Sequence, residues 1–331
     1  MKLKREGILV GAIVIGLLMG CSSVSDLADG DITDMSPDDM AADLQDQAQE
    51  RAEAEVEDRA DAAQAEVKIR ATVQSPHRSD ENTARDEYRN PVDTLTFFGV
   101  APDQRLIELM PGESGWYAEI LAPLIASEGT YTAASPHIEE NASGDEIAAH
   151  VPEEYQDQFE QASTLVNMDN IQLARFAPGD AITLGEPGSA DTVLTFRNLH
   201  SLYNGGHLEE ALAAVEEVLV PGGVFGVVQH RAPEGSDPEE TAPKGYLPEA
   251  FVIETIEAAG FVLEETSEVN ANPMDTADHE DGVWALPPTL RGGEETAEQF
   301  KEIGESDRMT LRFVKPEDAD AGEVAADDDA E

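Results

Sequence analysis

The stretch LIELMPGESGWYAEIL, residues Leu106–Leu121, combines three local patterns. A short apolar run ends in an acid, Glu108. A turn with Gly112 and Gly115 follows, and an apolar pattern at helical spacing closes the stretch. Glycine permits a close backbone approach, and the first turn of a helix presents free N–H groups. The stretch therefore predicts a strand, a tight turn and a helix whose N-terminus faces the turn.

Strand and helix patterns alternate on either side of this stretch. Apolar, β-branched runs predict strands at 105–109, 129–134, 191–196, 223–229, 261–265 and 309–314. Helical spacing predicts helices at 93–99, 115–126, 208–218 and 248–259. This alternation favours an α/β fold in which helices cover both faces of a mostly parallel sheet. In such sheets ligands bind at the carboxyl ends of the strands, where the strand order reverses.

The ends of the chain differ in composition from its middle. Residues 1–20 have a basic start and an apolar run, the pattern of an export signal. Residues 21–74 are rich in acids and alanine without any aromatic residue, which predicts a solvated stalk or a loosely paired helix. Residues 317–331 carry eight acids and no base, which predicts a disordered tail. The remaining residues, 75–316, have the length of one domain.

The charge of the chain excludes one class of partner. Seventy acidic residues against twenty basic ones give a formal charge of −50 and a pI of about 4.1. Such a chain repels itself at low salt, and at ~1 M salt the screening length falls to ~3 Å, so the composition indicates adaptation to high salt. No cluster of lysine and arginine follows residues 1–20, so we expect no nucleic-acid ligand. The seven histidines have no metal-ligand spacing, so we expect no metal.

The stretch LMGC, Leu18–Cys21, resembles the lipobox of bacterial lipoproteins, in which the cysteine becomes the lipid-modified first residue. This resemblance implies a lipid anchor on the periplasmic side of the cell envelope, and Ser22 favours the outer membrane. The alternative is a short, uncleaved membrane anchor. Once Cys21 is acylated, no thiol remains for a disulfide, a metal site or a nucleophile.

The acid and the glycine turn of Leu106–Leu121 resemble the first motif of class I S-adenosylmethionine (SAM) dependent methyltransferases, with Met110 and Ser114 where glycines are usual. VLVPGGVFGVVQHR, Val218–Arg231, resembles a helix, turn and strand late in that fold, and AGFVLEE and MTLRFVKP resemble its closing antiparallel pair. With SPHRSDENTARDEYRNPVDTLTFFG, DTVLTFRNLH and WALPP, the segments between Ser75 and Pro316 resemble a bacterial family of predicted methyltransferases. The resemblance implies a Rossmann-like class I methyltransferase fold, mostly parallel with an antiparallel last strand.

The same resemblance implies which residues contact SAM as the cofactor. They belong to the turn, the adjoining helix and the start of strand 191–196: Glu108, Pro111, Gly112, Gly115, Trp116 and Asp191. Tyr117 stands beside Trp116 on the helix. In the parent superfamily a second acid often closes the next strand and holds the ribose, whereas here Ser135 and Pro136 follow that strand.

Candidate catalytic groups follow two predicted strands. FRNLH supplies a cation, an amide and an imidazole, Arg197, Asn198 and His200, and His230 follows strand 223–229 as a second candidate base. A methyl transfer to oxygen or nitrogen needs a base only if the acceptor holds its proton at the working pH. The alternatives are structural, because Arg197 can pair with an acid, Asn198 can cap a turn and His200 can be a satisfied core histidine.

Three functions remain open on this evidence. The first is a SAM-dependent methyltransferase that aligns donor and acceptor, a small molecule or an envelope component. The second is a binding module that kept the cleft, and the third is a structural envelope lipoprotein. The basic residues His77, Arg78, Arg85 and Arg89 either cover the cleft or bind an anionic substrate, or they pair with neighbouring acids. Trp284 stands in a long insertion before the last strand, which predicts a lid over the cleft.

Overall fold

The computed structural model describes residues 37–112, 114–136 and 170–317. The leader, Cys21 and the acidic tail fall outside these residues, so the lipid anchor stays a prediction from the sequence. In the described part of the chain, no helix combines the length and the apolar character that crossing a membrane requires. The chain divides into two compact units, Met1–Arg59 and Ala60–Glu331.

A long helix, α1 (Pro37–Val73), occupies much of the segment up to residue 74 for which the sequence left a solvated stalk or a helix open. Alanine, glutamate, glutamine and arginine favour helix, and the described side chains up to Arg59 are largely exposed because the apolar stripe is thin. The last turns belong to the second unit, where Ile69 is fully buried in an apolar cluster. The second unit therefore starts earlier than residue 75, the expected boundary.

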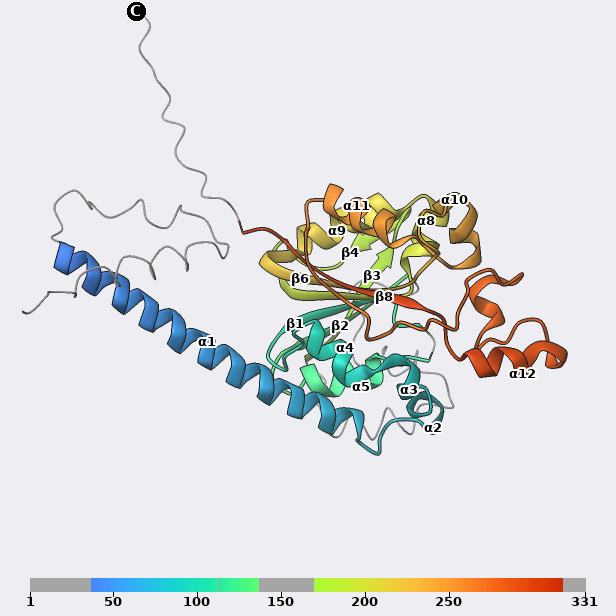
Figure 1. The fold of residues 1–331 in the computed structure, drawn as a ribbon, viewed down its shortest axis with the longest axis horizontal. Helices are drawn as coiled ribbons and strands as arrows, with labels where there is room; N and C mark the ends of the chain where they lie inside the picture. Colours follow the sequence, from blue (N-terminus) through green and yellow to red (C-terminus); the bar gives the residue numbers. More distant parts are fainter. Residues whose placement is uncertain (1–36, 113, 137–169, 318–331) are drawn as a thin grey trace, which may run out of the picture. The chain divides into compact units, whose positions relative to one another are not determined.

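The second unit is built around a sheet whose described strands have the order β4-β3-β2-β1-β5-β6-β8-β7 (Figure 1). The strands are β1 (Arg105–Leu109), β2 (Thr130–Ser135), β3 (Ile171–Ala177), β4 (Ala181–Thr183), β5 (Ala190–Phe196), β6 (Leu219–His230), β7 (Val262–Ser267) and β8 (Arg308–Val314). Strands β3, β2, β1, β5 and β6 run parallel, β8 is antiparallel to both β6 and β7, and β4 is antiparallel to β3. The mostly parallel sheet with an antiparallel last strand is therefore confirmed.

Helices cover both faces of this sheet, as Figure 1 shows. One face carries α4 (Pro91–Phe97), α5 (Ala118–Ile125) and the end of α1, and the other carries α8 (Leu199–Gly205), α9 (Leu208–Val218) and α11 (Glu249–Ala258). The shorter helices are α2 (Asp80–Thr83), α3 (Asp86–Arg89), α10 (Pro238–Thr241) and α12 (Glu294–Ile303), with 3-10 turns at Ala242–Lys244 and Gly282–Ala285.

The apolar pattern of each element explains this layering. Successive strand residues point to opposite faces, so Leu106 of β1 joins the cluster under α5, whereas Ile107 joins the cluster under α9. In α9, LEEALAAVEEV, the buried residues recur at helical spacing, and two acids in its first turn face the positive end of the helix dipole.

The chain leaves β1 outward to β2 and β3, and it returns on the other side of β1 as β5. The strand order therefore reverses between β1 and β5. Their parallel register, Leu106 opposite Thr192 and Leu109 opposite Thr195, brings the carboxyl ends of both strands to one edge of the sheet. A ligand site is expected at this edge.

Candidate functional site

A cavity of about 380 Å³ opens at the carboxyl ends of β1, β5 and β6. Its volume lies within the range of small-molecule sites, ~300–1,000 Å³. The lining includes residues of the turn after β1, the segments after β5 and β6, the α3 region and the connection between β7 and β8: Glu108, Met110, Pro111, Gly112, Trp116, Phe196, Arg197, Asn198, His200, His230, Arg85, Arg89, Trp284, Glu305 and Ser306.

The turn after β1 forms the inner wall of the cavity. Met110 leaves the strand in the left-handed region, with φ of 49°, and its N–H still donates to Ala134 O at 2.7 Å. A side chain in this region costs ~1–2 kcal/mol, so Met110 holds a conformation that glycine adopts freely. The motif that this turn resembles has a glycine at this position. Gly112 follows with φ of 76°.

Glu108 is buried, with 2 % of its surface exposed, and its Oε2 accepts a hydrogen bond from the Tyr131 hydroxyl at 2.6 Å. Burial raises the pKa of Glu108 to about 7, while the bond from Tyr131 and the charge of Arg197 act in the opposite direction. At neutral pH the site therefore holds this carboxyl group in both protonation states.

We expect Glu108 to make folding stability depend on pH. Because folding raises its pKa from 4.5 to about 7, the stability that the protonated carboxyl contributes is complete below about pH 4.5 and is lost as pH rises through about 7. The loss amounts to about 3 kcal/mol of unfolding free energy. Urea unfolding at about pH 5 and about pH 8 should show this loss in the parent protein and not in Glu108→Gln. The exposed Glu257→Gln serves as the control, and equal pH dependence in all three proteins would refute the assignment.

Glu305 is the centre of a buried charge cluster beside the cavity. Its carboxylate accepts hydrogen bonds from Arg85 Nε at 2.7 Å, Arg89 Nε at 3.1 Å and Arg308 Nη1 at 3.1 Å. Burial raises the pKa of Glu305, but the guanidinium groups of Arg89, Arg308, Arg85 and Arg197 outweigh it and lower the pKa to about 2. The carboxylate is therefore ionised throughout the neutral range.

Arg197 and Asn198 follow β5 with different roles. Arg197 is in the left-handed region, with φ of 66°, and its N–H donates to Val228 O at 2.6 Å. Burial lowers the pKa of the Arg197 guanidinium to about 10. Among the described residues, its side chain has no hydrogen bond or ion pair, so the alternative in which Arg197 pairs with an acid is not seen there. The Asn198 amide donates to Leu109 O at 2.9 Å and ties the end of β5 to the end of β1.

The rings of His200 and His230 lie beside each other, with centroids 5.8 Å apart. Gln229 Nε2 donates to Gly245 O at 3.1 Å and faces His200 Nδ1 at 3.3 Å. An amide NH₂ group has no acceptor, so Nδ1 of His200 accepts and the ring proton is assigned to Nε2. His230 Nδ1 lies 2.6 Å from Ser306 Oγ.

Both histidines are neutral at pH 7. Burial lowers the pKa of His200 to about 4, and the bond from Gln229 opposes the shift. Burial, followed by the charges of His200 and the nearby arginines, lowers the pKa of His230 well below its usual value. A neutral imidazole can accept a proton at its unprotonated nitrogen. His230 is the better candidate, because the Ser306 hydroxyl can accept from its Nδ1 and leave Nε2 free, whereas the Gln229 amide places the proton of His200 on Nε2.

The connection between β7 and β8, residues 268–307, supplies the outer wall of the cavity. Trp284 lines the cavity with its ring centroid 6.0 Å from that of His200, beside the cleft as the insertion predicted. In the part of the chain that the structure describes, no group of three or more His, Cys, Asp or Glu side chains could hold a metal ion.

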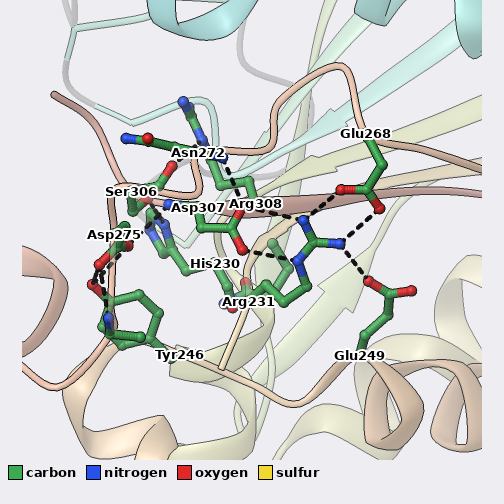
Figure 2. Close-up of polar contacts among 12 residues, drawn as sticks. His230, Arg231, Tyr246, Glu249, Glu268, Asn272, Asp275, Ser306, Asp307 and Arg308 are labelled. Atoms are coloured by element: carbon green, nitrogen blue, oxygen red, sulfur yellow. Dashed lines mark hydrogen bonds and ion pairs between the residues drawn. The ribbon is translucent and has the colours of Figure 1, made fainter. Parts of the chain in front are cut away.

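Arg231 fixes this connection to the end of β6 (Figure 2). Its guanidinium bonds to Asp307 through Nε at 2.9 Å, to Glu249 at 3.0 Å and to Glu268 at 2.7 and 2.9 Å. Asp275 accepts from the Asp307 N–H at 2.9 Å, which anchors the residues next to Ser306. These bonds hold Ser306 against His230.

Two predicted site residues do not line the cavity. Asp191 lies at the start of β5, at the opposite edge of the sheet, where it bonds to the Arg105 backbone N–H at 2.8 Å and guanidinium at 2.5 and 3.0 Å. The prediction that Asp191 contacts the cofactor does not fit this position, because an acid at the start of a parallel strand lies far from the carboxyl end of that strand, where the cavity is. Gly115 closes the turn, with its N–H donating to Gly112 O at 3.3 Å.

Glu305, Ser306 and Tyr131 belong to the site but were not predicted from the sequence. Glu305 and Ser306 stand in ESDR directly before the last strand, where charged residues gave the only signal. Arg85 and Arg89 both line the cavity and pair with an acid, but that acid is Glu305 and not one of their sequence neighbours.

The strand order without the short β4, and the antiparallel β8, define the Rossmann-like class I methyltransferase fold. A SAM-dependent methyltransferase from Aquifex aeolicus aligns at a TM-score of 0.44 and 14% identity, over 76% of this chain and 98% of that chain. The [4+2]-cyclase SpnF aligns at a TM-score of 0.47 and 13% identity, over 74% of this chain and 85% of that chain. An S-adenosylmethionine dependent methyltransferase from Mesorhizobium loti aligns at a TM-score of 0.37 and 15% identity, over 65% of this chain and 92% of that chain. A scan against protein-family models and a search of the curated proteins each found no match.

Proposed function

We propose that this protein is a SAM-dependent methyltransferase that acts on a small molecule or an envelope component. One observation carries the proposal: a single cavity at the reversal of strand order joins the glycine turn after β1 to two neutral imidazoles after β5 and β6. Because a fold hosts many reactions, the proposal rests on these groups and their geometry.

The residues at the end of β1 fit SAM. Gly112 lines the cavity, and a Cβ built there would meet nothing within 4 Å, so the space beside the turn is open. Glu108, Pro111, Gly112 and Trp116 would hold the cofactor, and the aromatic side chain of Phe196 adds an apolar face. Bound SAM would supply an electrophilic methyl group.

The chain itself would align and deprotonate the acceptor. His230 would take the acceptor's proton, and Ser306 at Nδ1 fixes the orientation of the ring. Asn198 holds the β5 wall of the cavity against the β1 wall, which keeps the two binding regions in register.

We expect SAM to bind the folded protein with micromolar affinity, and Gly112→Val to weaken this binding by at least about tenfold because the added side chain enters the open space. Gly188→Val is the matched control. Gly188 has φ of 66° with nothing within 4 Å of a built Cβ, and its carbonyl faces Arg105 at the other edge of the sheet. Both variants thus carry similar backbone strain.

The measurement is calorimetric titration of SAM into the full-length protein in detergent and about 1 M salt, with circular dichroism to establish folding. Equal SAM affinity in Gly112→Val and Gly188→Val would remove the turn from the cofactor site. Absence of SAM binding to the folded protein would overturn the proposal.

The second candidate is a binding module that kept the cleft without the reaction, or a structural envelope lipoprotein. Two observations favour it: β2 ends in Ser135 where the parent superfamily often has an acid, and Met110 replaces a glycine at positive φ. A folded protein that binds no SAM in the titration above would favour this candidate.

A further inference from the structure

The cavity has a charge opposite to that of the chain. Its ionisable lining includes three arginines, Arg85, Arg89 and Arg197, against two acids, Glu108 and Glu305. Glu305 is ionised, whereas Glu108 is only partly ionised at neutral pH. The lining is therefore net positive in a protein with a formal charge of −50.

Arg89 lines this space and has an unused donor. Its side chain is 2 % exposed, its Nε donates to Glu305 at 3.1 Å and its guanidinium lies 4.7 Å from the centre of the Trp116 ring. Nη1 is buried and has no hydrogen-bond partner in the described part of the chain. A buried, charged donor without an acceptor is costly, so the site is built to receive one.

Arg197 supplies a second cation to the same space. Arg197 lines the cavity, and its side chain has no hydrogen bond or ion pair with any described residue. Burial lowers the pKa of Arg89, and the positive charge of Arg197 lowers it further. Two neighbouring guanidinium groups repel each other unless an anion lies between them, and Glu305 already accepts bonds from three arginines.

We propose that Arg89 and Arg197 bind an anionic group, a carboxylate or a phosphate, of the molecule that is methylated. The proposal rests on the proposed function, which gives the cavity a cofactor as well as an acceptor. Arg85 and Arg308 hold Glu305 in place, and the hydrogen bond from Arg89 Nε to Glu305 fixes the position of the Arg89 guanidinium. The guanidinium forks suit the planar or tetrahedral oxygens of these anions.

The carboxylate of the cofactor's own amino-acid part has the same chemistry, and a competition experiment separates the two sources. The probes are benzoate and inorganic phosphate, titrated calorimetrically into the full-length protein in detergent at an ionic strength of about 0.15 M. Each titration is done without S-adenosylhomocysteine and with saturating S-adenosylhomocysteine, and circular dichroism establishes folding. We expect one of the two anions to bind with millimolar affinity in both conditions.

Arg197→Gln should weaken that binding about ten- to a hundredfold, the effect of losing one charge-assisted hydrogen bond. Arg197→Lys keeps the charge but loses the guanidinium fork, so its affinity should fall between those of the parent protein and Arg197→Gln. The control Arg105→Gln makes the same charge change at the far edge of the sheet and should leave the affinity unchanged. The titration of the parent protein tests the proposal even if a variant fails to fold, because the parent itself must bind one of the two anions.

Three results would overturn the proposal. Neither anion binds the folded protein; binding persists unchanged in Arg197→Gln; or S-adenosylhomocysteine displaces the anion, which would assign the arginines to the cofactor carboxylate. The last result leaves the proposed function intact. Failure of S-adenosylhomocysteine itself to bind would overturn the proposed function, and with it the assignment of the anion to a methyl acceptor.

Discussion

Glu305→Ala is expected to lower the free energy of unfolding by about 3–5 kcal/mol, since it removes the carboxylate on which Arg85, Arg89 and Arg308 converge. The carboxylate is 5 % exposed, so its loss leaves buried guanidinium groups without a counter-charge. Urea unfolding of the full-length protein measures the change. Glu298→Ala is the control, because that exposed acid pairs with Lys301 at the surface and should change stability by less than about 1 kcal/mol.

The pH dependence of the same protein checks the assignment. Folding lowers the pKa of Glu305 from 4.5 to about 2, so the stability from its ionised form is present above about pH 4.5 and is lost as pH falls towards 2. Acid unfolding of Glu305→Ala should lack this component. A loss below about 1 kcal/mol at neutral pH, with an unchanged acid transition, would mean that the arginines are stabilised by solvent instead.

Trp116→Ala is expected to cost about 3–5 kcal/mol of unfolding free energy. The indole is 1 % exposed, its Nε1 donates to Asn82 O at 2.8 Å, and the guanidinium groups of Arg78 and Arg89 lie 5.3 and 4.7 Å from the ring centre. The substitution therefore removes a large core side chain, a hydrogen bond and two cation–π contacts together. Thermal and urea unfolding measure the loss.

Trp284→Ala provides the comparison for Trp116→Ala. Trp284 is half-buried at the cavity wall and its main ring contacts are His200 and the guanidinium of Arg291. We expect a smaller loss of stability than for Trp116. Equal losses in the two variants would show that the burial of Trp116 does not hold the segment before β1 in place.

The sequence predicts the central elements because their patterns are local. The strand 105–109 and the helix 208–218 match β1 and α9, since apolar runs and helical spacing are read within one element. The strand predicted at 223–229 begins earlier, at Leu219, because Leu219 already pairs with Ala190 and the ProGlyGly segment forms an irregularity inside β6 instead of a separate turn before it.

Other elements depend on contacts that spacing does not show. Two elements, β3 and α8, were not predicted from the sequence. The place of β3 in the sheet follows from the strand order and not from its own alternating residues. In α8, two glycines at the end of the helix obscure its helical pattern. The burial of Ile69 depends on a groove beside α4 and α5, so the acidic, alanine-rich segment resembled a solvated stalk.

In the candidate site, too, residues with a local sequence signal were predicted and residues defined by distant contacts were not. Arg197, Asn198, His200 and His230 were predicted because they follow apolar strands in the chain. Glu305 was not, because two of its three arginine partners, Arg85 and Arg89, lie more than two hundred residues away in the sequence and meet it only in the folded chain.

Met110 and Arg197, the two residues that leave neighbouring strands β1 and β5, both have positive φ although neither is glycine. Backbone preference and the use of the cavity favour different residues here, since glycine would relax the turn and would also remove a side chain from the wall. At this edge of the sheet, the residues that line the cavity therefore lower the stability of the fold relative to glycine. Substitutions that stabilise this fold are therefore best sought away from that edge.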